Sequence, residues 1–243
     1  MALIETESLI LKTYNLAEAD KVVVLLTRDH GIVRGVAKGA KRLKSRFGSG
    51  LEPFSVVRAT YFEKENIELV SIQRTELVRS IFAAASDPEF LQKFSYLSDL
   101  LTSFLPPHDP NEKLYRMTSA CLDQCATDIG SLLSIGVYFE VWLLRLTGYL
   151  PDWTRCQECG RAFNEMENAG MQTNFALLCT NCRRAASNRS LDGPARQIVS
   201  AAMRLSPAEF SGSMSGMDEE LRDLSATLKY LISHSLGREI NGV

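Results

Sequence analysis

The hydrophobic period of this chain changes shortly after residue 80, and that change limits the folds open to it. Before it, short runs of Val, Ile, Leu, Tyr and Phe alternate with turn residues, whereas from Ser86 onward apolar residues recur every three or four positions. The first pattern is typical of strands and the second of amphipathic helices. We therefore expect an α+β protein whose strands precede its helices, with domains at residues 1–80 and 81–243.

Five strands are predicted in the first part, at residues 7–14, 20–27, 31–38, 54–63 and 66–73. Five strands in so short a stretch indicate a small barrel. An OB-type β-barrel is favoured, because the grooved face and loops of such barrels commonly hold single-stranded nucleic acid. An SH3-like barrel would fit the strand count almost as well.

The second part is predicted to be mainly α-helical. Its apolar spacing, with proline and glycine as stop signals, indicates helices at residues 88–104, 109–125, 131–147, 190–205 and 217–236, and a small, flexible connection at 211–216. The third helix is apolar on most sides, so it should lie at the centre of its bundle.

A dense basic run lies between the third and fourth predicted strands. Residues 34–46 contain six cations and no acid in a chain of net charge −2, and glycines flank and interrupt them. Glycine lets backbone approach a ligand closely, and clustered cations usually meet a polyanion. We predict contact with a nucleic-acid backbone through Arg34, Lys38, Lys41, Arg42, Lys44 and Arg46. The alternative is a solvated loop that only aids solubility.

Two CxxC pairs, Cys156/Cys159 and Cys179/Cys182, are separated by nineteen residues, within the spacing of a two-knuckle zinc site. Four thiolates leave Zn²⁺ no open position, so the site would be structural. We expect a four-cysteine zinc knuckle within residues 153–185, its net charge of −2 offset by neighbouring arginines at positions 155, 161, 183 and 184. A thiol oxidoreductase that uses one CxxC pair is a weaker alternative, and Cys121 and Cys125 are expected in the core.

The sequence favours a binding protein over an enzyme. It contains no GxxxxGK[ST], GxSxG, HExxH or GxGxxG motif, which leaves ATP hydrolysis and the common hydrolase and dinucleotide chemistries unsupported. The first residues lack the pattern of a secretory signal, so we expect a cytoplasmic protein. A zinc-containing RNA- or ribosome-associated factor is the second hypothesis, because OB barrels and zinc knuckles serve RNA equally well.

Taken together, these residues resemble the RecO family of bacterial recombination mediators. The matching stretches are residues 20–27, 30–31, 37–46, 51–54 and 139–151, together with the four cysteines. The most specific of them are residues 37–54 and the Gly-Tyr-Leu-Pro sequence at 148–151, which leads into the first CxxC pair.

The resemblance implies an N-terminal OB domain, a helical domain with a zinc knuckle, and no catalysis. It further implies binding of single- and double-stranded DNA, annealing of complementary strands without ATP, and cooperation with RecR and the single-stranded-DNA-binding protein (SSB) in loading RecA. In this chain the cations of residues 34–46 would hold phosphates. Tyr14, Phe47 and Tyr61 are candidates for base stacking, with a place in the barrel core as the alternative for each.

Overall fold

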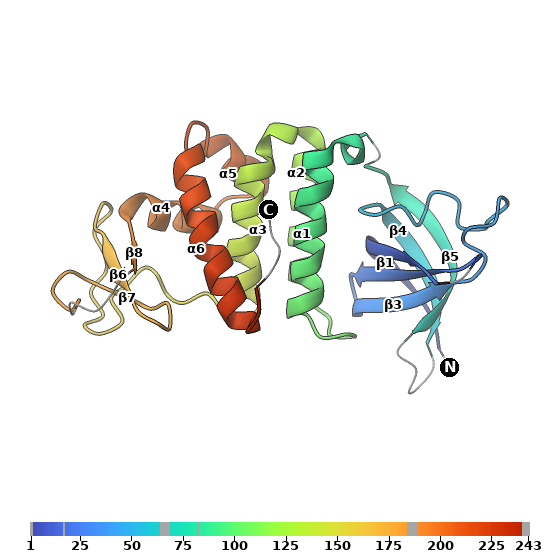
Figure 1. Ribbon diagram of the computed structural model, residues 1–243, viewed down its shortest axis with the longest axis horizontal. Coiled ribbons are helices and arrows are strands. Elements are labelled where there is room, and N and C mark those ends of the chain that lie inside the picture. The colour runs from blue at the N-terminus through green and yellow to red at the C-terminus, as the bar shows by residue number, and fades with distance from the viewer. Residues whose placement is uncertain (1, 17, 64–68, 82, 184–188, 240–243) are drawn as a thin grey trace. The chain divides into compact units, whose positions relative to one another are not determined.

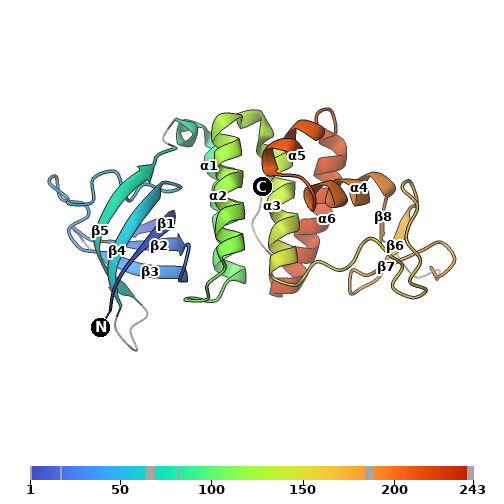
Figure 2. The same cartoon turned by 180° about the vertical axis from the view of Figure 1, so that it is seen from behind.

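The computed structural model describes residues 2–16, 18–63, 69–81, 83–183 and 189–239, and Figures 1 and 2 show its ribbon from opposite sides. It separates into two compact units, Met1–Ile129 and Gly130–Gly242. The first contains β1 (Ala2–Asn15), β2 (Lys21–Thr27), β3 (Gly31–Ala37), β4 (Val56–Glu63), β5 (Val70–Arg79), the 3₁₀ turn η1 (Ala84–Ser86), α1 (Pro88–Phe104) and α2 (Glu112–Thr127).

The 3₁₀ turn η2 (Ile129–Ser131) leads from the first unit into the second. The second contains α3 (Leu132–Leu146), β6 (Ala169–Met171), β7 (Leu177–Leu178), β8 (Arg189–Leu191), α4 (Gly193–Ala202), α5 (Pro207–Ser213) and α6 (Asp218–Leu236).

The five N-terminal strands form a closed barrel in the order β1-β2-β3-β5-β4, and β4 pairs back onto β1. All pairs are antiparallel except β3 and β5, which run parallel. This is an OB-like arrangement. Inward-facing apolar side chains fill the barrel, among them Ile10, Val23, Val33, Val57 and Ile72.

Strand β1 closes the barrel by pairing on both sides. Its first half, Ala2–Leu9, pairs with β4, and its second half, from Ser8 to Asn15, pairs with β2. The strand is therefore longer than the predicted segment 7–14. β5 also differs from the prediction, since it starts at Val70 and runs to Arg79. The predicted start of that strand, residues 66–68, lies outside the described residues.

Helix α1 packs aromatic rings against the chain that enters β4. Asp87 caps the helix by accepting hydrogen bonds from the backbone N–H groups of Glu89 and Phe90, at 2.8 and 3.0 Å. The Phe90 and Phe94 rings stack with centroids 4.5 Å apart, and the Phe54 ring lies 5.7 Å from that of Phe94. The apolar face predicted for residues 88–104 is thus buried within the first unit.

In the second unit, α3 is the central helix. The Tyr138 hydroxyl donates to the carbonyl of Leu205 at 3.1 Å, and the Trp142 indole N–H donates to that of Ala202 at 2.8 Å. The buried Glu140 carboxylate accepts from the Ser225 hydroxyl on α6 at 3.0 Å. The stretch Ile129–Leu146 has the length and hydropathy of a membrane span, but 67% of it is buried inside the protein, as in a core helix.

Two details of the predicted helices were wrong. The segment 190–205 begins as strand β8, and its helix α4 starts only at Gly193 after the Asp192 cap. The predicted connection 211–216 is partly helical, because α5 runs to Ser213. A capping box between Ser206 and Glu209 starts α5.

At Gly31 the backbone conformation and a close neighbour both disfavour a side chain. The φ of Gly31 is +66°, and a Cβ there would lie 2.2 Å from the carbonyl oxygen of Asp109. Gly48 also has a positive φ, of +50°, but a Cβ there would meet nothing within 4 Å. We expect Gly48→Ala to lower the free energy of unfolding by about 1 kcal/mol and Gly31→Ala by at least about 3 kcal/mol. Urea denaturation followed by circular dichroism measures both, and equal losses would contradict the clash.

Candidate nucleic-acid interface and metal centre

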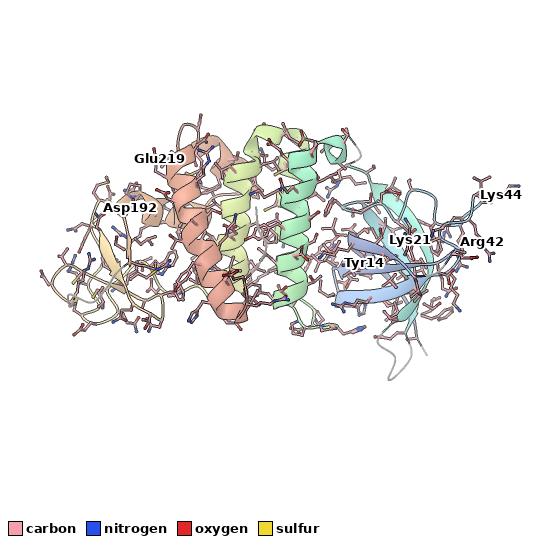
Figure 3. All side chains as sticks on the ribbon, in the orientation of Figure 1. Tyr14, Lys21, Arg42, Lys44, Asp192 and Glu219 are labelled. Carbon is pink, nitrogen blue, oxygen red and sulfur yellow. The ribbon has the colours of Figure 1, made fainter. Side chains whose placement is uncertain are left out.

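The predicted basic residues lie together at the start of the β3–β4 connection. Arg34 is on β3, and the other five lie in residues 38–46, which we call the basic loop. All six side chains are exposed. Figure 3 shows the labelled Arg42 and Lys44 on the part of this loop that projects from the barrel. The prediction that the run lies mostly in a connecting loop is confirmed.

The basic loop is anchored at both ends. At its start, the Gly39 N–H donates to the Asp20 carboxylate at 2.8 Å, and the Lys41 N–H donates to the carbonyl of Ala19 at 3.0 Å. Just beyond its end, Phe47 is buried with the barrel core. The cations are therefore presented from a loop with defined ends, which lowers the entropy that a ligand must remove on binding.

Several of these cations are available to a ligand. Among the residues that the structure describes, Arg34, Lys38, Arg42 and Lys44 have no ion-pair partner. The Arg46 guanidinium lies 5.1 Å from the centroid of the Phe47 ring. By contrast, the exposed Arg58 and Arg74 elsewhere on the barrel have carboxylates within 3.8 and 2.6 Å. Four cations without an ion-pair partner among the described residues are thus gathered here.

The three aromatic candidates for base stacking differ in their exposure to solvent. Tyr61 and Phe47 are 0% and 3% exposed and belong to the barrel core, so neither can meet a base in this conformation. Tyr14, near the end of β1, is 52% exposed. Only Tyr14 of the three keeps the geometry that stacking requires.

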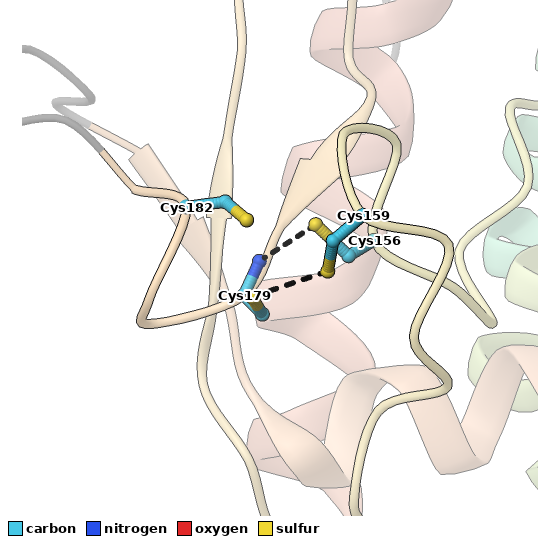
Figure 4. Close-up of side chains that lie close together, drawn as sticks. All are labelled: Cys156, Cys159, Cys179 and Cys182. Atoms are coloured by element: carbon cyan, nitrogen blue, oxygen red, sulfur yellow. Dashed lines mark hydrogen bonds between the residues drawn. The ribbon is translucent and has the colours of Figure 1, made fainter.

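The four cysteines of the CxxC pairs converge in the second unit. Their sulfur atoms all lie within 4.8 Å of one another, and those of Cys159 and Cys179 are 3.9 Å apart (Figure 4). Sulfurs around a tetrahedral Zn²⁺ would be about 3.8 Å apart. Cys156 and Cys179 are buried, whereas Cys159 is exposed. The donor set and its size therefore suit a metal ion bound by four thiolates.

Each CxxC pair lies in a tight turn closed by backbone hydrogen bonds. The Gly160 N–H donates to the carbonyl of Cys156 at 2.9 Å, and the Cys182 N–H donates to that of Cys179 at 3.1 Å. The two turns are joined because the Gln157 N–H donates to the carbonyl of Leu177 on β7, at 2.9 Å. This backbone framework brings the second pair beside the first, although nineteen residues separate them in the sequence.

The cysteine cluster favours a bound cation electrostatically. Burial alone would raise the pKa of Cys179, but hydrogen bonds from the Cys182 backbone and the Arg161 guanidinium outweigh burial and lower that pKa to about 6. Shared hydrogen bonds with Cys179 and Cys159 raise the pKa of Cys182 to about 12. Crowded thiols thus share protons that a divalent cation would replace.

Of the four arginines expected to offset the thiolate charge, Arg161 lies close enough to Cys179 to lower the pKa of its thiol. Its guanidinium also makes two hydrogen bonds to the Glu167 carboxylate, at 2.6 and 2.9 Å. The hydrogen bond from Arg161 lowers the pKa of Glu167 to about 2. Arg155 and Arg183 are exposed, and Arg184 lies outside the described residues.

Cys121 and Cys125 do not join this cluster. Both are buried on α2, as predicted for core residues. Sequence reasoning missed Glu167, which holds Arg161 in place, and Asp20, which fixes the start of the basic loop. Neither residue belongs to a motif, and only the folded chain brings each to its partner.

The position of Arg161 beside the cysteine cluster predicts that its removal lowers the affinity for the metal. Removing its guanidinium should weaken metal binding about 10- to 100-fold, because Cys179 would lose the neighbouring cation that lowers the pKa of its thiol. Competition with a chromogenic chelator would compare Arg161→Ala with Arg155→Ala. Arg155 is also next to a ligand, but its guanidinium reaches the carbonyl of Gly160 at 3.5 Å rather than a sulfur. Equal chelator competition by the two variants would contradict this role of Arg161.

Comparison with known proteins agrees with this arrangement along nearly the whole chain. The family described as recombination protein O N terminal matches residues 1–81, and the one described as recombination protein O C terminal matches residues 86–242.

Individual relatives agree with the family match. The chain is 32% identical to the DNA repair protein RecO of Koribacter versatilis over 209 residues, which cover 86% of this chain and 84% of that protein. It is 31% identical to that of Geobacter metallireducens (74% and 72% covered) and 28% identical to that of Myxococcus xanthus (98% and 95% covered). The protein with this OB-like barrel and cysteine cluster belongs to the RecO family of DNA repair proteins.

Proposed function

We propose that this protein is a non-catalytic recombination mediator that anneals complementary single strands without ATP. The observation that carries the proposal is the basic loop, where exposed cations extend from an OB-like barrel on a stretch of chain that contains no acidic residue. Arg34, Lys38, Lys41, Arg42, Lys44 and Arg46 would hold phosphates of single- or double-stranded DNA without reading sequence.

Annealing follows from charge neutralisation. Two complementary strands repel each other through their phosphates, and a cationic loop that contacts both lowers that repulsion at the point where pairing begins. Because the loop is anchored by Asp20 and Phe47, the cations remain displayed together. Tyr14 would add base stacking to this backbone contact.

We further propose that the helical part, residues 81–243, contacts RecR and SSB, so that the protein helps to load RecA onto SSB-coated DNA in the cytoplasm, at the nucleoid. Residues 81–243 have a net charge of −5, with nineteen Asp/Glu against fourteen Lys/Arg, whereas residues 1–80 have +3. Like charge would direct DNA away from the helical part and toward the barrel, and leave the helices for protein partners.

The metal is proposed to be one structural Zn²⁺ bound by Cys156, Cys159, Cys179 and Cys182. Four sulfur ligands favour Zn²⁺ over Mg²⁺ or Ca²⁺, which prefer oxygen, and they leave no position for a reacting water. When bound, the ion would cross-link the two CxxC turns.

The main test compares annealing by two variants of equal charge. Lys38→Ala/Lys41→Ala/Arg42→Ala should lose annealing of SSB-coated complementary strands. Arg58→Ala/Arg74→Ala/Arg222→Ala, which removes three exposed cations paired with acids, should keep it. With all six contacts the slope of log affinity for single-stranded DNA against log salt should be about −4, falling to about −2 in the first variant.

Loss of annealing in both variants would show a general charge effect rather than a site in the basic loop. Tighter binding of RNA than DNA in direct competition would favour the RNA-associated alternative.

The zinc proposal predicts one zinc ion per chain by elemental analysis of freshly purified protein. Cys179→Ser should lose the metal and lower the melting temperature, because a buried ligand is replaced. Cys121→Ser changes a buried cysteine outside the cluster and should retain the metal. Four freely titratable thiols in wild-type protein without metal would overturn the assignment.

A further inference from the structure

Leu43 lies in the middle of the basic loop and is 104% exposed, whereas Met166, the next most exposed large apolar side chain among those described, is 70% exposed. Arg42 and Lys44 flank it, and both are exposed without an ion-pair partner among the described residues. The side chains of Arg42 and Lys44 do not cover Leu43, so its apolar side chain is fully exposed to water.

The backbone holds Leu43 at the corner of a turn. The Ser45 N–H donates to the carbonyl of Arg42 at 2.9 Å, which makes residues 42–45 a β-turn with Leu43 and Lys44 at its two central positions. A second turn precedes it, because the Arg42 N–H donates to the carbonyl of Gly39 at 3.1 Å. Central turn positions point away from the chain that they connect, so Leu43 leads the loop outward.

We propose that Leu43 is an apolar wedge that enters the minor groove of duplex DNA and partly unstacks one base-pair step. Apolar side chains such as leucine act in this way in architectural DNA-binding proteins, where cations beside them bind the phosphates. The inference rests on the proposed function of the basic loop as a DNA site and adds how the loop engages the duplex.

The dimensions of the turn fit this role. The Cα atoms of Arg42 and Lys44 are at most about 7 Å apart, and the minor groove is about 6 Å wide. Two long cationic side chains on either side of Leu43 can therefore reach the phosphates on both edges of the groove while the leucine enters it. Single strands have no such groove, so Leu43 should matter for duplex affinity and little for single-strand affinity.

The wedge is tested with a short duplex in which 2-aminopurine replaces adenine at its TA steps, the steps that unstack most easily. Wild-type protein should raise 2-aminopurine fluorescence on binding. Leu43→Ala should abolish the rise and weaken duplex binding about tenfold at an unchanged salt slope, and Leu43→Phe should preserve both. Leu3→Ala removes another exposed leucine of the barrel, 61% exposed on β1, and should behave as wild type.

Arg42→Ala/Lys44→Ala separates failure of the wedge from failure of the DNA site. It should reduce the magnitude of the duplex salt slope by about 2. If this change occurs while Leu43→Ala keeps wild-type affinity and fluorescence, the loop binds DNA and the wedge is wrong. If neither variant changes duplex binding, the basic loop is not the DNA site. Leu43 is fully exposed, so unchanged melting temperatures would verify that each variant is folded.

Discussion

Closure of the barrel through β1 is the constraint on which the N-terminal unit depends. A single strand satisfies hydrogen bonds of β4 with its first half and of β2 with its second, so the sheet closes on itself there. Its register shifts between Ile10 and Lys12, which lets the strand bend from one partner to the other. Ile10 also makes backbone hydrogen bonds with Phe54 and Ser55, at 2.7 and 3.0 Å. The chain that follows the basic loop is thereby fixed to the same strand.

The basic loop depends on that closure. Asp20 precedes β2 and holds Gly39, while Phe47 fills the barrel interior with Val23 and Ile72. The loop between these anchors is free of acidic residues. The buried barrel core thus holds a loop of exposed cations in place, as is usual where binding residues lie on loops over a rigid scaffold. The cysteine cluster has a comparable role in the second unit. Three of its cysteines pack with Leu178 and Phe163 into a small core, in a segment whose strands are very short.

Much of this arrangement could be predicted from local patterns. The short apolar runs of Val, Ile and Leu in β2 and β3, and the apolar stripe of α1, indicate their structures directly. The cysteine spacing similarly predicts the cluster. Sequence patterns did not predict structure that depends on tertiary contacts. At β8, three residues pair with β6 although a helix follows directly. Charge density indicated the basic loop, but the burial of Tyr61 and the exposure of Leu43 depend on how the barrel folds around them.

The pairing of β1 with β4 has a consequence for synthesis of the protein. Ala2–Leu9 leaves the ribosome before β2 and β3, yet its partner on β4 begins only at Val56. At about 5–20 residues per second, half of the first strand stays unpaired for several seconds while the later strands are made. Glu5 and Glu7 lie in this stretch, and like charges on an unpaired strand oppose its pairing with copies from neighbouring nascent chains. Until β4 is made, the like charge of Glu5 and Glu7 therefore disfavours pairing of this stretch with copies of itself.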